Sequence, residues 1–158
     1  MIYPYDSPEE IIEAIKNGTD LKAIAYNSGL DELDLEDAKG AAAAGIEPLT
    51  IITPYFVAEA KLRKECEKYS LNTSILADWV EYIKKIALDS EEMARKIIKK
   101  DKSLEDCLAE LIEYSFNNAF DIPSEIAKKA IPNMHGKVTL GIPNMLEAKR
   151  IITNYYSK

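Results

Sequence analysis

The sequence predicts a mainly α protein, a compact bundle of seven to nine short helices with one short strand or hairpin near residues 137–142. Three observations support this fold class. Apolar residues recur at three- and four-residue spacing, capping residues precede these stretches, and glycine ends several of them. The 158 residues, 47% of them hydrophobic, can form a core without disulfides or metals. We therefore expect a single domain over residues 1–158.

The first part of the chain, residues 1–46, predicts an acidic N-terminal unit of three short helices. Each helix begins near a capping or acidic residue and ends at a glycine, as short helices commonly do. The expected helices begin near Ser7, Thr19 and Asp34 and end at Gly18, Gly29 and Gly45. In the third helix, we expect Leu33 and Leu35 to point inward. The small residues 38–45 should let another backbone approach closely.

Residues 50–158 predict the helical body. Residues 47–53 are compatible with a short strand or with the entry to a helix, because periodicity cannot decide over so few residues. Polar capping residues then mark the following helices. Five helices are expected to begin near Thr53, Ser74, Ser90, Ser103 and Asn144, with a further helix after Pro123-Ser124. The stretch from Lys137 to Ile142 is the best strand candidate.

Charge is distributed unevenly along the chain. The formal net charge is −7. Residues 1–50 contain 11 acidic and 3 basic side chains, a net of −8, whereas residues 51–100 have 8 and 10, a net of +2. This asymmetry disfavours a simple nucleic-acid binder, which needs a basic surface. It favours a partner whose basic surface meets the N-terminal unit.

The strongest local signal is an acidic run within DELDLEDAKGAAAAG, residues 31–45. Its carboxylates are Asp31, Glu32, Asp34, Glu36 and Asp37. One or two acids at a helix N-terminus contribute about 0.3–1 kcal/mol each through the helix dipole, and five exceed that use. The alternatives are a solvated acidic loop that caps a helix, or carboxylates that mimic a nucleic-acid backbone and occupy a basic channel. A calcium loop is disfavoured, because the mid-loop glycine and terminal glutamate of an EF-hand are missing.

A basic run and three potentially reactive residues provide the other candidate sites. The basic run, RKIIKKDK, contains Arg95, Lys96, Lys99, Lys100 and Lys102. These cations either stabilise a helix C-terminus or form a small nucleic-acid-binding patch. His135 is the single histidine, so a Cys–His dyad would have to pair it with Cys66 or Cys107. We predict no catalytic residue, metal site or cofactor.

The N-terminus lacks a basic segment followed by an apolar one, and no apolar run approaches the ~18 residues of a membrane span. We therefore expect a cytoplasmic protein with no membrane partner and with both cysteines reduced.

A stretch of about 25 residues begins with Lys102-Ser103-Leu104-Glu105-Asp106-Cys107-Leu108, continues as an aliphatic helix and ends with Ile122-Pro123-Ser124-Glu125. This stretch resembles the C-terminal part of PcfK-like proteins, which are small accessory proteins of conjugative plasmids and phage-like elements. The resemblance implies a mobile-element origin. Small acidic helical proteins of such elements include anti-CRISPR proteins, some of which resemble DNA in charge, so that analogy of class extends the inference.

These observations predict a non-enzymatic inhibitor or accessory protein of a mobile element. Its acidic N-terminal face would dock on a basic, nucleic-acid-binding surface of a host protein such as a CRISPR nuclease. The alternative is an accessory factor that binds nucleic acid through residues 95–102, which the charge balance makes the weaker hypothesis.

Overall fold

The computed structural model describes residues 3–71, 74–133 and 135–158. Within these ranges the chain forms nine α-helices, a 3-10 helix and a two-stranded antiparallel sheet, which confirms the predicted mainly α class. In chain order, the elements are α1 (Pro8–Lys16), α2 (Leu21–Ser28), α3 (Glu32–Ala43), η1 (Pro48–Thr50), α4 (Pro54–Tyr69), α5 (Ser74–Asp89), α6 (Glu91–Ile98), α7 (Leu104–Asn117), β1 (Phe120–Asp121), α8 (Ser124–Ala130), β2 (Thr139–Leu140) and α9 (Met145–Ser157).

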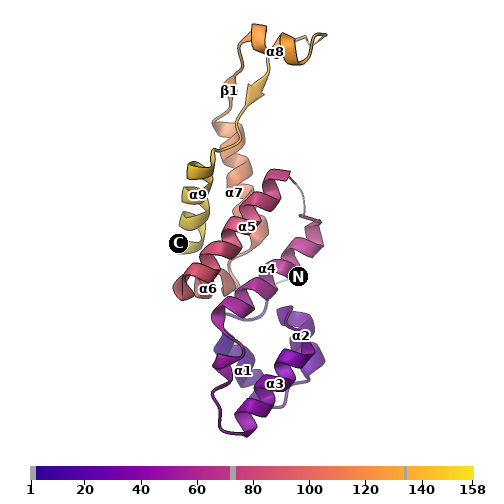
Figure 1. Ribbon diagram of the computed structural model, residues 1–158, viewed down its shortest axis with the longest axis vertical. Helices are drawn as coiled ribbons and strands as arrows, with labels where there is room; N and C mark the ends of the chain where they lie inside the picture. The colour runs from indigo at the N-terminus through magenta and orange to yellow at the C-terminus, as the bar shows by residue number, and fades with distance from the viewer. Residues whose placement is uncertain (1–2, 72–73, 134) are drawn as a thin grey trace.

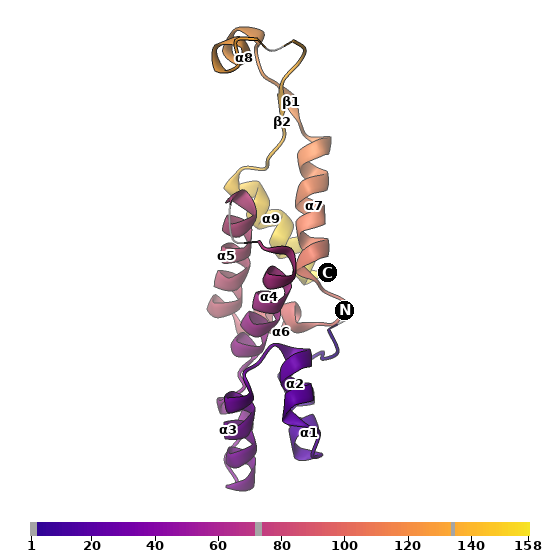
Figure 2. The same cartoon turned by 90° about the vertical axis from the view of Figure 1, so that its right-hand side faces the viewer.

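The elements lie in three levels along the long axis of the molecule (Figures 1 and 2). Helices α1, α2 and α3 form one end, and α4, α5, α6, α7 and α9 form the middle. At the other end, β1, α8 and β2 project beyond α7 and α9, and we call residues 118–144 the arm. The acidic N-terminal unit and the arm therefore occupy opposite ends of the molecule.

Side-chain caps begin five of the helices at positions that the sequence predicts. In each, the side-chain oxygen accepts a hydrogen bond from the backbone N–H three residues later, at 2.9 to 3.4 Å. The capping residues are Ser7, Thr53, Ser90, Ser103 and Asn144. Such a cap contributes about 1 kcal/mol, because it satisfies one of the N–H groups that a helix start leaves without a partner.

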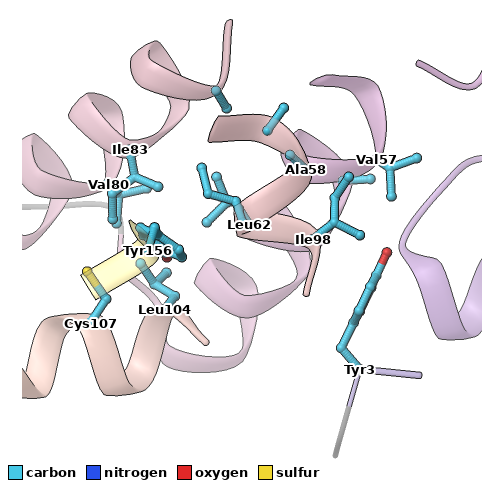
Figure 3. Packing of buried hydrophobic residues seen from close by; sticks show 14 of the residues in the cluster. Tyr3, Val57, Ala58, Leu62, Val80, Ile83, Ile98, Leu104, Cys107 and Tyr156 are labelled. Atoms are coloured by element: carbon cyan, nitrogen blue, oxygen red, sulfur yellow. The ribbon is translucent and has the colours of Figure 1, made fainter. Parts of the chain in front are cut away.

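The core is centred on α4, which packs on α2, α5, α6 and α7. Figure 3 shows Leu62 of α4 facing Val80 and Ile83 of α5, with Ile98 and Tyr156 close by. The same cluster of buried hydrophobic residues includes Ile11, Ile24 and Leu35 of the N-terminal unit. The N-terminal unit and the body thus share one continuous core.

Two details of the backbone differ from the sequence-based expectation or resolve its ambiguity. Residues 47–53 form neither a strand nor an α-helix entry but contain the 3-10 helix η1. Gly40 was expected to allow another backbone to approach, yet a Cβ at this position would meet no atom within 4 Å. That expectation is wrong at Gly40 and at the exposed residues 43–45, whereas Ala38 and Ala41 are buried as small residues against the core.

The arm begins where α7 ends. Its ribbon pairs Phe120 with Leu140 and Asp121 with Thr139, so the predicted strand near residues 137–142 exists and its partner lies about 20 residues earlier in the chain. The returning chain passes very close to α7 at Gly141, where a Cβ would overlap the carbonyl oxygen of Ser115. Glycine at this position therefore lets the arm return against its own base.

Candidate protein-binding surface

The acidic run lies on α3 at one end of the molecule (Figure 2). Leu35, Ala38 and Ala41 attach this helix to the core, because their side chains are 0, 0 and 6% exposed and recur at three-residue spacing. The acids lie on the N-terminal half of the helix and at its N-cap, and Lys39 and Gly40 follow on the exposed surface. Asp31, Glu32, Glu36 and Asp37 are exposed, and Asp34 is half-buried.

None of these five carboxylates forms an ion pair with another residue in the described parts of the chain. Asp31 occupies the N-cap position of α3, but its side chain makes no capping hydrogen bond. The expected use of one carboxylate as a side-chain cap is therefore not seen at Asp31. The negative charge of this surface remains available to a partner.

Leu33 lies among these acids and is 67% exposed, so the expectation that it points inward is wrong. The helix begins at Glu32, earlier than the predicted start near Asp34, so Leu33 lies within it. Two residues that are two positions apart in a helix lie about 200° apart around the axis, so Leu33 and Leu35 cannot both face the core. Leu33 shares its face with Glu36 and Asp37, three and four residues later. The surface thus combines an apolar centre with carboxylates, a combination common at binding sites. We call Asp31, Glu32, Leu33, Asp34, Glu36 and Asp37 the acidic face.

The basic run lies in α6 and the turn that follows it, and three of its five cations form ion pairs within the chain. The pairs are Arg95 with Glu9 and Glu91, Lys96 with Glu92, and Lys100 with Asp6, at 2.6 to 2.9 Å. The hydrogen bond from Lys100 lowers the pKa of Asp6. Lys102 lies over the ring of Tyr155, 5.0 Å from its centroid. Much of this charge therefore joins the N-terminal segment to α6, which leaves less of it for phosphates.

A buried lysine, Lys61, is the residue that the sequence analysis missed. Its side chain is 1% exposed, and Nζ lies 2.7 to 3.2 Å from four backbone carbonyl oxygens, which share its three N–H donors. The carbonyls belong to Ile97, Ile98, Lys99 and Lys102. Burial lowers the pKa of Lys61 to about 8, and the carbonyls favour the charged form, so the ammonium caps the C-terminus of α6 at neutral pH.

Neighbouring charged residues of α4 also serve helix ends. Lys64 Nζ donates to the carbonyls of Tyr26 and Asn27 at the end of α2, and Glu65 accepts from the N–H of Leu104 at the start of α7, at 3.0 Å. Burial raises the pKa of Glu65. A hollow of about 290 Å³ lies beside these residues and Tyr3. Three of the ionisable side chains that line this hollow, Lys61, Lys64 and Glu65, therefore bind helix termini.

The structure does not bring His135 to either cysteine. Cys107 is buried in the core beside Leu104 (Figure 3), whereas His135 is exposed between α8 and β2 at the far end of the arm. Both thiols are free, and burial raises the pKa of Cys66 and raises that of Cys107 to about 12. Neither cysteine therefore has the lowered pKa of an activated nucleophile.

Two absences concern residues 3–71, 74–133 and 135–158. No three His, Cys, Asp or Glu side chains in these ranges gather where they could hold a metal ion. None of the helices formed there is long and apolar enough to cross a bilayer.

No family model, curated protein or solved structure matches this chain. The resemblance to PcfK-like proteins and the analogy with anti-CRISPR proteins stay predictions from the sequence. The acidic face on α3 is accordingly judged on its own geometry and charge.

Proposed function

We propose that this protein is a non-enzymatic binding protein whose acidic face docks on a basic surface of another protein. The observation that supports this proposal is the set of five carboxylates around the exposed Leu33, none of them ion-paired within the described residues. Opposite charge steers such partners together, and an apolar side chain at the centre of the contact adds affinity that salt does not screen.

The partner that fits this chemistry has a groove lined with Lys and Arg, such as the nucleic-acid channel of a nuclease. Carboxylates held on a helix can occupy the positions that phosphates take in such a groove. The protein would then act as an inhibitor or accessory factor of a mobile element. CRISPR nucleases are one class of host protein with a channel of this kind. Direct binding of nucleic acid through residues 95–102 has less support, because three of those cations are paired within the chain.

The proposal is tested with a quadruple variant that neutralises the acidic face: Asp31→Asn, Asp34→Asn, Glu36→Gln and Asp37→Asn. A matched control makes the same change in net charge at exposed acids elsewhere: Glu67→Gln, Asp78→Asn, Asp89→Asn and Asp101→Asn. Affinity capture from a host lysate with mass spectrometry identifies candidate partners. Affinity for the purified partner is then measured at low and high salt.

We expect the quadruple variant to bind about fourfold to several hundredfold more weakly, since each of the four lost charge contacts contributes about 0.2–1 kcal/mol. The control should bind like wild type, and wild-type affinity should fall as salt rises. Competition with double-stranded DNA for the same partner would support a nucleic-acid channel. Equal affinity of wild type and quadruple variant would reject the proposal. A gel shift of DNA or RNA by the protein alone would favour the basic run instead.

A further inference from the structure

The arm and its base expose most of the large apolar side chains found on the surface. Nine of the fifteen exposed large hydrophobic residues in the described parts of the chain lie between residues 112 and 146. They are Ile112, Phe116, Phe120, Ile126, Ile131, Leu140, Ile142, Met145 and Leu146, between 42 and 81% exposed. Soluble monomers rarely leave a large apolar patch uncovered. The protein's own body does not cover this surface, because the arm projects away from it (Figure 2).

The ribbon of the arm is too small to be stable without further contacts. Each strand has two residues, and one additional hydrogen bond, from the N–H of Ile122 to the carbonyl of Val138 at 2.8 Å, extends the pairing. Two-stranded ribbons alone are marginally stable in water. Phe120 and Leu140 are directly opposed and therefore share one face of the ribbon. This ribbon offers a partner both an apolar face and free strand edges.

A hollow at the base of the arm can receive an apolar side chain. It has a volume of about 230 Å³, and the exposed residues Phe116, Leu140 and Ile142 line it. The close approach of Gly141 to Ser115 shapes this hollow. Helix α8 presents Ile126, 60% exposed, at the other end of the arm. The surface thus carries an apolar projection at its tip and an apolar recess at its base.

The charges of the arm and its base are complementary. Helix α7 contains four acids and no basic residue. Two of these acids are paired within the chain, Glu105 with Lys68 and Glu110 with Lys158, whereas Glu113, near the arm, forms no ion pair among the described residues. At the tip, Lys128 and Lys129 of α8 form no ion pair among the described residues either, and the single acid of α8 is Glu125. Lys128, Lys129 and Glu113 are exposed. The surface therefore presents two exposed lysines at its tip and an exposed carboxylate, Glu113, near its base.

We propose that the arm is a dimerisation surface and that its partner is a second copy of this chain. In a twofold arrangement the two arms run antiparallel. Each α8 then lies against the partner's α7, with lysines opposite acids and Ile126 near the hollow. A twofold interface uses the same surface on both copies, so it requires a surface that is complementary to itself. Two pairs of features meet that requirement. The projecting Ile126 can enter the partner's hollow, and the lysines of α8 can face the partner's Glu113. The acidic face lies at the opposite end of each copy and stays free, so a dimer presents two such faces.

The test measures molar mass by size-exclusion chromatography with light scattering, loading wild-type protein from about 1 to 200 µM. The expected result is twice 17.7 kDa at high concentration, with dissociation on dilution. Ile126→Asp should raise the dimer dissociation constant at least tenfold. Leu88→Asp, at a side chain 62% exposed on α5, is the matched control and should leave it unchanged. A mass of 17.7 kDa at every concentration would overturn the proposal.

Charge reversal tests the antiparallel arrangement. Lys128→Glu with Lys129→Glu should weaken the dimer, and adding Glu113→Lys should restore part of its affinity. Failure of the third substitution to restore affinity would overturn the pairing of α8 with α7.

Hydrogen exchange of wild-type protein gives a readout that depends on no variant. The amides of residues 118–124 and 138–142 should exchange more slowly at 100 µM than at 1 µM. If the mass doubles while protection rises only in other segments, the arm is not the interface.

Discussion

Gly29 lies against Ala60 so closely that a Cβ on Gly29 would come within 2.7 Å of the carbonyl oxygen of Ala60. Gly29 also has a positive φ of 81° at the C-terminus of α2, a conformation that side chains disfavour. The glycine therefore serves two purposes. It ends α2, and it lets this helix end pack on α4, which joins the N-terminal unit to the body.

Two glycine-to-alanine substitutions should change stability in opposite directions. Gly29→Ala is expected to lower the free energy of unfolding by about 2 kcal/mol or more, because it adds both backbone strain and a clash with Ala60. Gly40 lies in the exposed part of α3 with free space around it, so Gly40→Ala should raise the free energy of unfolding by about 0.5–1 kcal/mol. Urea unfolding of both variants measures the difference. Destabilisation by Gly40→Ala would contradict the free space that the structure shows around this glycine.

Replacing the buried lysine, Lys61→Met, should change how stability depends on pH. The pKa of Lys61 is about 8 in the folded state and about 10.4 in an unfolded chain. Between these values the unfolded state binds the extra proton, so the stability of wild type rises with pH relative to the Met variant. Relative to the Met variant, the free energy of unfolding of wild type should increase by about 3 kcal/mol between pH 7 and pH 10.

The measurement for Lys61 is urea unfolding of wild type and Lys61→Met at several pH values from 7 to 10. The variant is the required reference, because cysteines and tyrosines titrate in both proteins above pH 9. An NMR titration of the Lys61 side chain in wild type should independently show a midpoint near 8. Parallel pH profiles for the two proteins would contradict this account of Lys61.

Two tyrosine-to-phenylalanine substitutions should have different effects on stability, because one removes a hydroxyl without a hydrogen-bond partner and the other removes a hydroxyl that accepts a hydrogen bond. The Tyr3 hydroxyl is buried with no hydrogen-bond partner among the described residues, so Tyr3→Phe should leave stability unchanged or raise it slightly. The Tyr155 hydroxyl accepts from the N–H of Ser103 at 2.9 Å. Tyr155→Phe should cost about 1–3 kcal/mol, because that N–H is left without a partner. Thermal unfolding compares the two variants, and equal effects would contradict the assignment.

Local signals in the sequence were sufficient for most helix boundaries. A Ser, Thr or Asn before an apolar stretch predicted five caps, because capping depends on residues three positions apart. The inward position predicted for Leu33 was wrong, because α3 begins two residues earlier than expected. Leu33 therefore lies within the helix, on the face opposite Leu35. The strand near residue 139 was found, but its partner at Phe120 follows directly on a helical pattern and carries no strand signal of its own.

Long-range relationships could not be predicted from the sequence. Lys61 lies in a charged stretch that resembles any solvated helix face, and its burial depends on carbonyls of another helix. The sequence likewise does not predict that the arm projects from the body. The apolar side chains of Ile126 and Leu140 are exposed, because most of the arm projects beyond the body. The acidic run was identified from charge alone, and its exposure is what the structure adds.

The cap that Lys61 provides for α6 has a consequence for the order of folding. The carbonyls it binds lie 36 to 41 residues later in the chain. During synthesis α4 therefore emerges first, with a charged side chain that has no acceptors until the end of α6 has followed. An isolated peptide spanning α6 and α7 would keep its serine caps and yet lack a donor for the carbonyls between the helices. The turn at residues 99–103 is thus part of the long-range structure of the protein, and it should form late.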